Sequence, residues 1–238
     1  IDQMKFTIYQ ESRPGKRPTN EDRIAYSYSR DALLMVVADG MGGHLHGEVA
    51  AQIAVQYITE AFQREAHPLL KDPFLFLSGA LGNAHHAILD YAADRFLPEA
   101  PRTTCVACIV QDSIAYWAHA GDSRLYAIRG GRILAQTRDH SRVQRMIEDG
   151  LITAEAAIHH PARNRIFSCL GGASAPQIDY SKKTPLMTGD PPRPAQRQRR
   201  SGDPRPAEPG RGPRRRQRRQ PVDDRHPLGR QLRRGHPR

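Results

Sequence analysis

Two kinds of apolar pattern follow one another along the first part of the chain. Leu33 to Ala38 is a short continuous apolar run ending at Asp39-Gly40, which is typical of a buried strand. From Glu48 to about Glu65 the apolar residues recur at helical spacing, with glutamines and glutamates mostly on the other side. This spacing predicts an amphipathic helix. A second helical stretch is expected over roughly Pro73 to Phe96.

After these helices the pattern changes to short strands separated by turn signals. We expect four strands: Thr104–Val110, Ile114–Ala118, Leu125–Ile128 and Arg132–Thr137. Their close spacing predicts an antiparallel meander. A helix over Ser141–Asp149 follows, and Gly150 stands in the expected position to end it. This order predicts an α+β domain in which sheet and helices are segregated, and not a parallel nucleotide-binding sheet.

Composition divides the chain of 238 residues into two parts. Residues 191–238 hold 16 Arg, no Lys and 4 acidic residues, a net charge of +12, whereas residues 1–190 have a net charge of −1. The second part has only five apolar residues, so the entropy lost on ordering it would have little burial to offset it. We therefore expect one domain over residues 1–190 and a disordered Arg/Pro-rich tail over residues 191–238.

Three short segments carry charged side chains of the kinds found in metal-binding and catalytic sites. Asp39 ends the apolar run and is followed by Gly-Met-Gly-Gly, so it offers a hard cation one fixed oxygen and room for a carbonyl and waters. Glu21-Asp22 is an acidic pair with Arg17 upstream, and Asp122 stands in a tight turn between two strands. Taken alone, the three segments are more typical of a glycine-rich turn, a solvated loop and an Asx turn, respectively.

Six short motifs follow one another along the chain: Arg-x-x-Asn-Glu-Asp (17–22), Val-Ala-Asp-Gly-Met-Gly-Gly-His-x-x-Gly-Glu (37–48), Thr-Thr (103–104), Ala-Gly-Asp-Ser-Arg-Leu-Tyr (120–126), Thr-x-Asp-His-Ser (137–141) and His-Pro-x-Arg-Asn (160–164). In this order, they resemble the motifs of the metal-dependent Ser/Thr protein phosphatases of the type 2C (PPM) family, and of its bacterial branch in particular. The resemblance covers about residues 5–190. It implies two antiparallel sheets stacked face to face and flanked by helices, with a two-metal site at one end of this sandwich.

The resemblance implies a metal-binding role for four of these residues. Asp39 matches the carboxylate that bridges two Mn²⁺ or Mg²⁺ ions, and Gly40 the residue whose carbonyl coordinates one of them. Asp22, with Glu21 beside it, matches the acidic pair that holds metal-bound waters. The implied reaction is hydrolysis of phosphoserine and phosphothreonine in proteins by a metal-activated water.

Three further residues complete the implied site. Arg17 matches the arginine that grips the substrate phosphate, for which a guanidinium fork is well suited. Asp122 matches an aspartate associated with a third, weaker metal, and His44 a histidine near the site. Met41 stands where the animal enzymes have histidine, which removes one candidate general acid.

The chain departs from the family after Asp190. Two further metal-binding aspartates and the last strands are expected there, but the Arg/Pro-rich tail stands in their place. Reading the codons of 191–197 one base later is compatible with Leu-Leu-Val-Leu-Leu-Ser-Asp, although codon degeneracy permits other readings. We interpret the tail as out of frame, with the last strands missing and the activity impaired. The alternatives are an inactive phosphatase-like fragment or a basic-tailed nucleic-acid-binding protein.

The remaining expectations concern partners and surroundings. We expect phosphorylated proteins as substrates, opposition to a Ser/Thr kinase, a monomer, and neither specific nucleic acid nor membrane as a partner. With no apolar run of membrane length and no secretory pattern at the N-terminus, we expect a cytoplasmic protein. Cys105 and Cys108 have redox-motif spacing but lie in an expected strand, where residues three apart face opposite sides, so we interpret both as core residues.

Overall fold

The structure is a computed structural model that describes residues 6–42, 46–187 and 192–193, the last two through their backbone alone. The chain divides into two units, Ile1–Ser201 and Gly202–Arg238. Everything described belongs to the first unit. Apart from Pro192 and Arg193, the expected tail lies outside the described residues, and so does His44. The expected domain boundary at residue 190 therefore stays a prediction.

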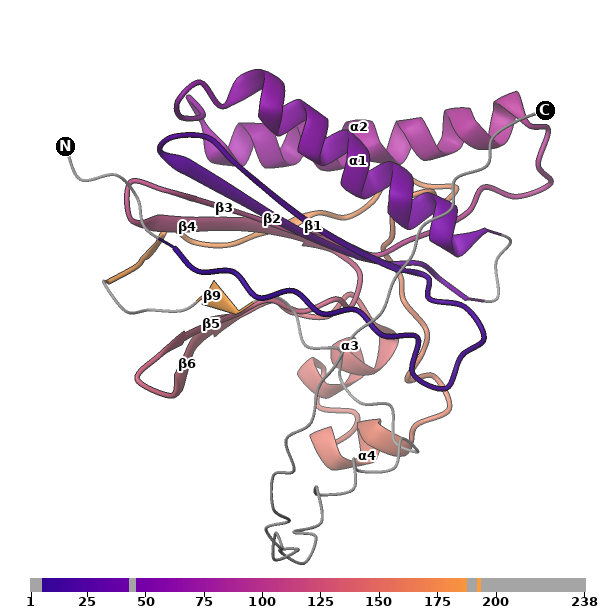
Figure 1. Ribbon diagram of the computed structural model, residues 1–238. Helices are drawn as coiled ribbons and strands as arrows, with labels where there is room; N and C mark the ends of the chain where they lie inside the picture. The colour runs from indigo at the N-terminus through magenta and orange to yellow at the C-terminus, as the bar shows by residue number, and fades with distance from the viewer. Residues whose placement is uncertain (1–5, 43–45, 188–191, 194–238) are drawn as a thin grey trace, which may run out of the picture. The chain divides into compact units, whose positions relative to one another are not determined.

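A large antiparallel sheet forms the centre of the unit (Figure 1). Its four longest strands follow one another in chain order, and two short strands pair with the last of them. In β2 even the residues facing away from the helices are at least half-buried, which explains its continuous apolar run. The strands are β1 (Asp22–Tyr28), β2 (Ala32–Asp39), β3 (Cys105–Gln111), β4 (Ile114–Ala120), β7 (Asp179–Tyr180) and β8 (Thr184–Pro185).

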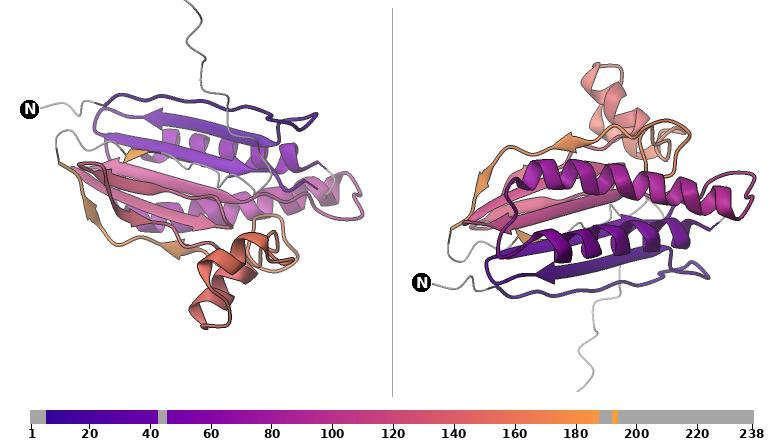
Figure 2. Two further views of the ribbon diagram at one scale, coloured as in Figure 1. Left: turned by 90° about the horizontal axis from the view of Figure 1, so that it is seen from below. Right: turned by 90° about the horizontal axis from the view of Figure 1, so that it is seen from above.

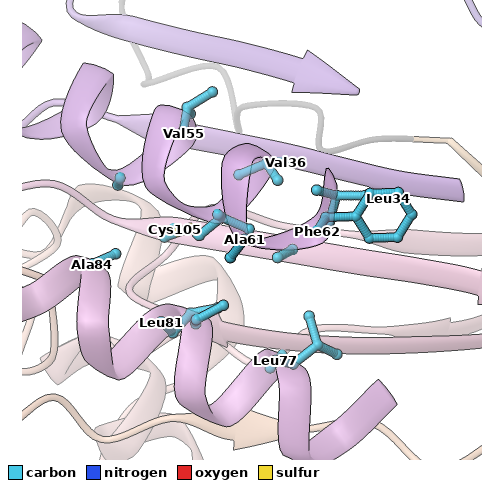
Figure 3. Close-up of a cluster of buried hydrophobic side chains, with 14 of the residues drawn as sticks. Leu34, Val36, Val55, Ala61, Phe62, Leu77, Leu81, Ala84 and Cys105 are labelled. Atoms are coloured by element: carbon cyan, nitrogen blue, oxygen red, sulfur yellow. The ribbon is translucent and has the colours of Figure 1, made fainter. Parts of the chain in front are cut away.

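Two long helices, α1 (Gly47–Glu65) and α2 (Pro73–Asp94), lie side by side on one face of this sheet (Figure 2). Asp72 fixes the start of α2, because its carboxylate accepts hydrogen bonds from the backbone N–H groups of residues 74 and 75. Figure 3 shows side chains of the two helices, among them Phe62 of α1 and Leu81 of α2, in one hydrophobic cluster with Leu34 of β2. This layer forms the larger of two hydrophobic clusters and confirms both expected helices.

The opposite face of the large sheet carries a second, three-stranded sheet of β5 (Tyr126–Arg129), β6 (Arg132–Gln136) and β9 (Pro192–Arg193). Leu125 and Ala127 join a cluster with residues of β2, β3 and β4. The expected four-strand meander is therefore wrong, because β4 pairs with β3 and β7 while β5 pairs with β6 and β9. The chain changes sheets at a turn where Gly121 has φ of +110°, a conformation that glycine adopts without strain. The α+β class with antiparallel sheets is confirmed.

Two short helices follow β6. The expected helix is α3 (Arg142–Glu148), and Ser141 caps it by accepting a hydrogen bond from the N–H of Gln144. Gly150 lies just beyond it with φ of +69°, as expected of a residue that ends a helix. A second helix, α4 (Ala154–His159), was not predicted from the sequence.

The two cysteines of β3 lie on opposite faces of the large sheet, as strand alternation predicts. Cys105 belongs to the cluster under the helices and Cys108 to the cluster facing the second sheet. Burial raises the pKa of each thiol to about 12, so neither forms the thiolate that attacks disulfides at neutral pH.

We expect a disulfide reagent such as DTNB to leave Cys105 and Cys108 unmodified in the native protein. Only the half-buried Cys169 should react, and slowly, because burial also raises the pKa of its thiol. All three thiols should react in guanidinium chloride. Rapid modification of two or more thiols in the native protein would contradict the burial of β3.

Candidate active site

Two of the sequence-predicted carboxylates meet at one end of the β1–β2 hairpin. Asp22, the first residue of β1, is the cross-strand partner of Asp39, the last residue of β2. Directly opposed residues of an antiparallel pair project to the same face, with Cβ atoms about 4.5–5.5 Å apart. Both aspartates are half-buried. This arrangement holds two carboxylates close together at a strand end.

Glu21 lies beside this pair, and Gly40, Gly42 and Gly47 approach it closely. The N–H of Gly40 donates to the carbonyl of Glu21 at 3.2 Å. A Cβ on Gly47 would lie 2.8 Å from Oε2 of Glu21 and 3.0 Å from the backbone nitrogen of Met41, so Gly47 packs closely against this carboxylate. Oε2 is buried and has no hydrogen-bonding partner among the described residues. An orphaned buried carboxylate oxygen is an acceptor that an ion or its hydration water would satisfy.

Arg17 reaches the same place from the segment before β1. Its Nη1 lies 3.1 Å from the point that a Cβ of Gly42 would occupy, and Oε2 of Glu21 lies 3.3 Å from that point. The guanidinium and the carboxylate therefore both border Gly42. The guanidinium of Arg17, a group suited to bind phosphate, therefore lies close to the carboxylates.

A hydrogen-bonded threonine connects Asp39 to the turn that carries Asp122. Thr104 donates its backbone N–H to the carbonyl of Asp39 at 3.0 Å, and its Oγ1 accepts from the N–H of Asp39 at 3.3 Å. The same Oγ1 lies 2.6 Å from Oγ of Ser123, the neighbour of Asp122. Sequence reasoning gave Thr104 no role, although the Thr-Thr pair before the strand was the available signal.

An ion pair holds the other end of this turn. Arg124 donates from Nε and Nη2 to the two carboxylate oxygens of Asp139, each at 2.6 Å. Both side chains are largely buried, at 16% and 12% exposure. The hydrogen bonds to Asp139 are the main reason why the pKa of Arg124 is raised above the ordinary value of arginine. A paired, bidentate guanidinium fixes the turn relative to the segment after β6.

The structure thus gathers Arg17, Glu21, Asp22, Asp39 and Gly40 at one end of the sheet and ties the turn bearing Asp122 to them. The donors are hard oxygens, which suit Mg²⁺ or Mn²⁺. The remaining predicted residue, His44, lies outside the described residues.

Gly40 provides a stability test of this packing. A Cβ at Gly40 would lie 2.5 Å from the carbonyl carbon and oxygen of Gly47 and 2.8 Å from the carbonyl oxygen of Glu21. Because all three contacts are backbone atoms, we expect Gly40→Ala to lower the free energy of unfolding by about 2–3 kcal/mol in urea titrations. The matched control is Gly79→Ala within α2, where a Cβ meets nothing within 4 Å. That change should stabilise the protein by roughly 0.5–1 kcal/mol. Equal effects of the two changes would contradict the close approach.

A family model described as Protein phosphatase 2C matches residues 11–151. The serine/threonine phosphatase stp of Listeria innocua is 31% identical over 176 residues, covering 73% of this chain and 69% of that protein. Protein phosphatase PhpP of Streptococcus pneumoniae is also 31% identical over 176 residues, covering 74% of this chain and 71% of that protein.

Solved structures agree with these matches. The phosphatase Stp1 of Staphylococcus aureus superposes with a TM-score of 0.67 at 29% identity, covering 78% of this chain and 77% of that chain. The catalytic domain of the Ser/Thr phosphatase PstP, solved with two manganese ions, gives a TM-score of 0.59 at 29% identity, covering 73% of this chain and 70% of that chain. Across the part of the chain that the structure describes, no helix is long and apolar enough to cross a membrane. The model match, the relatives and the shared fold show that this chain belongs to the PPM (type 2C) family of Ser/Thr protein phosphatases, in its bacterial branch.

Proposed function

We propose that this chain hydrolyses phosphoserine and phosphothreonine in proteins with the help of Mn²⁺ or Mg²⁺. The observation that carries the proposal is the direct opposition of Asp22 and Asp39, beside a buried Glu21 oxygen that has no hydrogen-bonding partner among the described residues. Close carboxylates repel one another unless a cation lies between or beside them. Membership of the phosphatase family and the relative solved with two manganese ions support the proposal of Mn²⁺ at this site.

In the proposed metal site, the carboxylate of Asp39 and the carbonyl of Gly40 would hold the cations, and Asp22 with Glu21 would accept hydrogen bonds from their hydration water. Bound cations supply a water of lowered pKa and neutralise phosphoryl oxygens. The half-buried guanidinium of Arg17 binds and orients the phosphate through its planar fork. Asp122 would contribute to a third, weaker cation site, and His44, which lies outside the described residues, would bind the substrate.

We further propose that the activity of this chain is reduced. The family's two later metal-binding aspartates have no counterpart in the sequence after Asp190, where Asp203, Asp223 and Asp224 stand in the Arg/Pro-rich tail. With fewer carboxylates, the repulsion between two cations of charge +2 would be less neutralised, so both would bind more weakly. The proposed partners are phosphorylated proteins that a Ser/Thr kinase supplies, and the proposed state is a monomer.

The function is tested by phosphate release from a phosphothreonine peptide with the purified 238-residue chain. We expect slow release that requires Mn²⁺ and stops with EDTA. Arg17→Gln should lower the rate by about 100-fold, because the phosphate loses a positioned charged donor. The matched control is Arg64→Gln, at an exposed arginine in the last turn of α1, which should leave the rate unchanged. Release that persists in EDTA would contradict the proposal. Mn²⁺ binding without any release would favour the inactive phosphatase-like alternative.

A further inference from the structure

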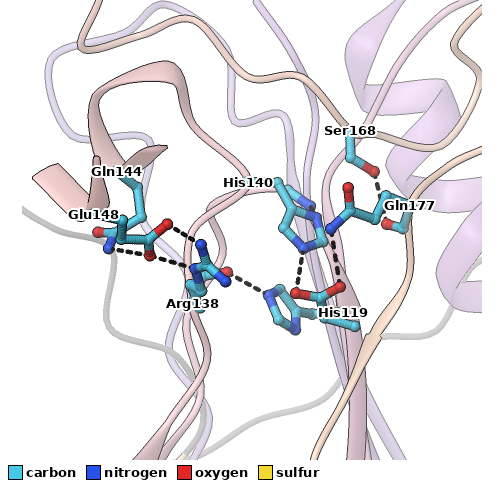
Figure 4. Close-up of polar contacts among 9 residues, drawn as sticks. His119, Arg138, His140, Gln144, Glu148, Ser168 and Gln177 are labelled. Atoms are coloured by element: carbon cyan, nitrogen blue, oxygen red, sulfur yellow. Dashed lines mark hydrogen bonds and ion pairs between the residues drawn. The ribbon is translucent and has the colours of Figure 1, made fainter. Parts of the chain in front are cut away.

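A second cluster of titratable side chains lies behind the turn that carries Asp122. His119 is in β4, His140 follows β6, and Asp179 is in β7 (Figure 4). The two imidazoles are stacked with ring centroids 4.6 Å apart, and they are 3% and 1% exposed. One ligand atom of each residue lies within 4.8 Å of the other two, which is close enough for a metal site. The hydrogen bonds of the cluster indicate whether it binds a metal ion or holds the neighbouring turn in place.

These hydrogen bonds assign the protons of both rings. The backbone N–H of Gly121 donates to Nδ1 of His140 at 3.2 Å, so Nδ1 carries a lone pair and Nε2 carries the proton. That Nε2 is buried and lies 3.2 Å from Oδ2 of Asp179, and no other described residue offers it an acceptor. Nε2 of His119 lies 2.6 Å from the carbonyl of Arg138, which can only accept, so this nitrogen is also protonated.

The carboxylate of Asp179 is suited to accept a hydrogen bond from Nε2–H of His140. Burial alone would raise the pKa of Asp179, but hydrogen bonds from Gln177 and His140 outweigh it and hold the pKa below its usual value. The carboxylate is therefore ionised at neutral pH. An ionised carboxylate facing Nε2 stabilises the Nε2–H tautomer, which leaves Nδ1 free to accept from Gly121.

The same assignment argues against a metal ion in the cluster. A cation bound to Nε2 of His140 would have to displace its proton while Nδ1 still faces the N–H of Gly121. The ring would then be an imidazolate without the Nδ1 proton that ligating histidines normally donate to an outer partner. The cluster is therefore better explained by its hydrogen bonds than by an ion.

We propose that His140, oriented by Asp179, is a positioning residue that fixes the Gly121–Ser123 turn and so places Asp122 for cation binding. The proposal rests on the metal site proposed above. His140 holds Gly121 twice, because Nδ1 accepts from its N–H at 3.2 Å and the backbone N–H of His140 donates to its carbonyl at 3.0 Å. On the other side, a Cβ on Gly121 would lie 2.6 Å from Cβ of Thr104, so the turn has no room to move in that direction.

Two substitutions separate the two contacts of the imidazole. In His140→Asn the amide oxygen can replace Nδ1 as acceptor for Gly121, whereas the contact with Asp179 is lost. In His140→Gln the longer side chain can replace Nε2 near Asp179, but no acceptor remains at the position of Nδ1. The positioning role therefore predicts that asparagine preserves the turn better than glutamine. A purely space-filling role predicts the reverse, because glutamine is closer in volume to histidine.

The test uses the full chain labelled with ¹⁵N. In the unmodified protein, the nitrogen shifts of His140 should show an unprotonated Nδ1 and a protonated Nε2. Asp179→Leu should shift this tautomer balance, and the control Asp90→Asn, at an exposed carboxylate of α2, should not. A protonated Nδ1, or Zn²⁺ binding that His140→Asn abolishes, would overturn the hydrogen-bonding assignment and with it the proposal.

The second readout is a Mg²⁺ titration followed through the amide signals of Asp22, Asp39 and Asp122. We expect His140→Gln to raise the apparent Mg²⁺ dissociation constant read from the Asp122 amide by about tenfold. His140→Asn should raise it clearly less. The response of Asp22 and Asp39 should change little. An Asp122 response that both variants keep at full strength would overturn the positioning role. If none of the three amides responds in the unmodified protein, the proposed metal site itself fails, and the positioning role falls with it.

Discussion

Replacing Asp39 with asparagine is expected to remove most of the stability that Mn²⁺ gives to this protein. A cation present at about 100 times its dissociation constant raises the free energy of unfolding by about 2.7 kcal/mol. Loss of an outer-sphere partner already weakens metal binding by about 10–100-fold, and Asp39 is proposed as the shared ligand. With affinity about 100-fold lower, roughly 0.4 kcal/mol of that stabilisation would remain at the same Mn²⁺ concentration. Thermal unfolding with Mn²⁺ and with EDTA measures the difference.

The control for this change lies on the same hairpin. Asp31 stands in the turn before β2, at the opposite end from Asp39, where it pairs with the neighbouring Arg30. Asp31→Asn should leave the Mn²⁺-dependent rise in melting temperature intact. If Asp39→Asn retains the full rise in melting temperature as well, the cation binds elsewhere, and the opposed Asp22 and Asp39 are not its site.

The elements that could be predicted from the sequence are those whose own residues carry a strong periodic signal. The apolar run of β2 and the helical spacing of α1 and α2 are long enough to predict the element type, and the observed bounds differ from the expected ones by at most two residues. Strand β1 escaped prediction because its sequence, Asp-Arg-Ile-Ala-Tyr-Ser-Tyr, mixes polar and apolar residues at an edge of the sheet. Edge strands need less apolar surface, so their pattern is weak.

The site shows the same division between local and long-range information. The residue types that suit a cation could be found locally, since Asp39 ends an apolar run and glycines follow it. The opposition of Asp22 to Asp39 depends on the register of β1 against β2, which no single segment specifies. The cluster of His119, His140 and Asp179 joins residues up to 60 positions apart in the chain, so it became visible only in three dimensions.

The largest gain in activity is expected from replacing residues 191–238 with the sequence encoded one base later. The short strand β9 pairs Pro192 with Ala127 and Arg193 with Tyr126. Proline has no N–H to donate, so this pairing of β5 is poor in hydrogen bonds. A reading one base later is compatible with Leu-Leu-Val-Leu-Leu at this point, and such a segment would be better suited to extend the second sheet. On β6, which pairs with the other edge of β5, Ile133 and Leu134 are 58% and 47% exposed.

We expect the frame-shifted chain to release phosphate from a phosphothreonine peptide at least about 100-fold faster in Mn²⁺, because a missing metal ligand costs no less than a missing outer-sphere partner. It should also be more soluble, since unpaired strand edges and exposed apolar side chains promote aggregation. The control is deletion of residues 191–238, which removes the tail without adding a strand and should not restore activity. A nucleotide sequence that allows no other frame after codon 190, together with salt-sensitive nucleic-acid binding that the deletion abolishes, would make the arginine-rich tail a genuine binding segment.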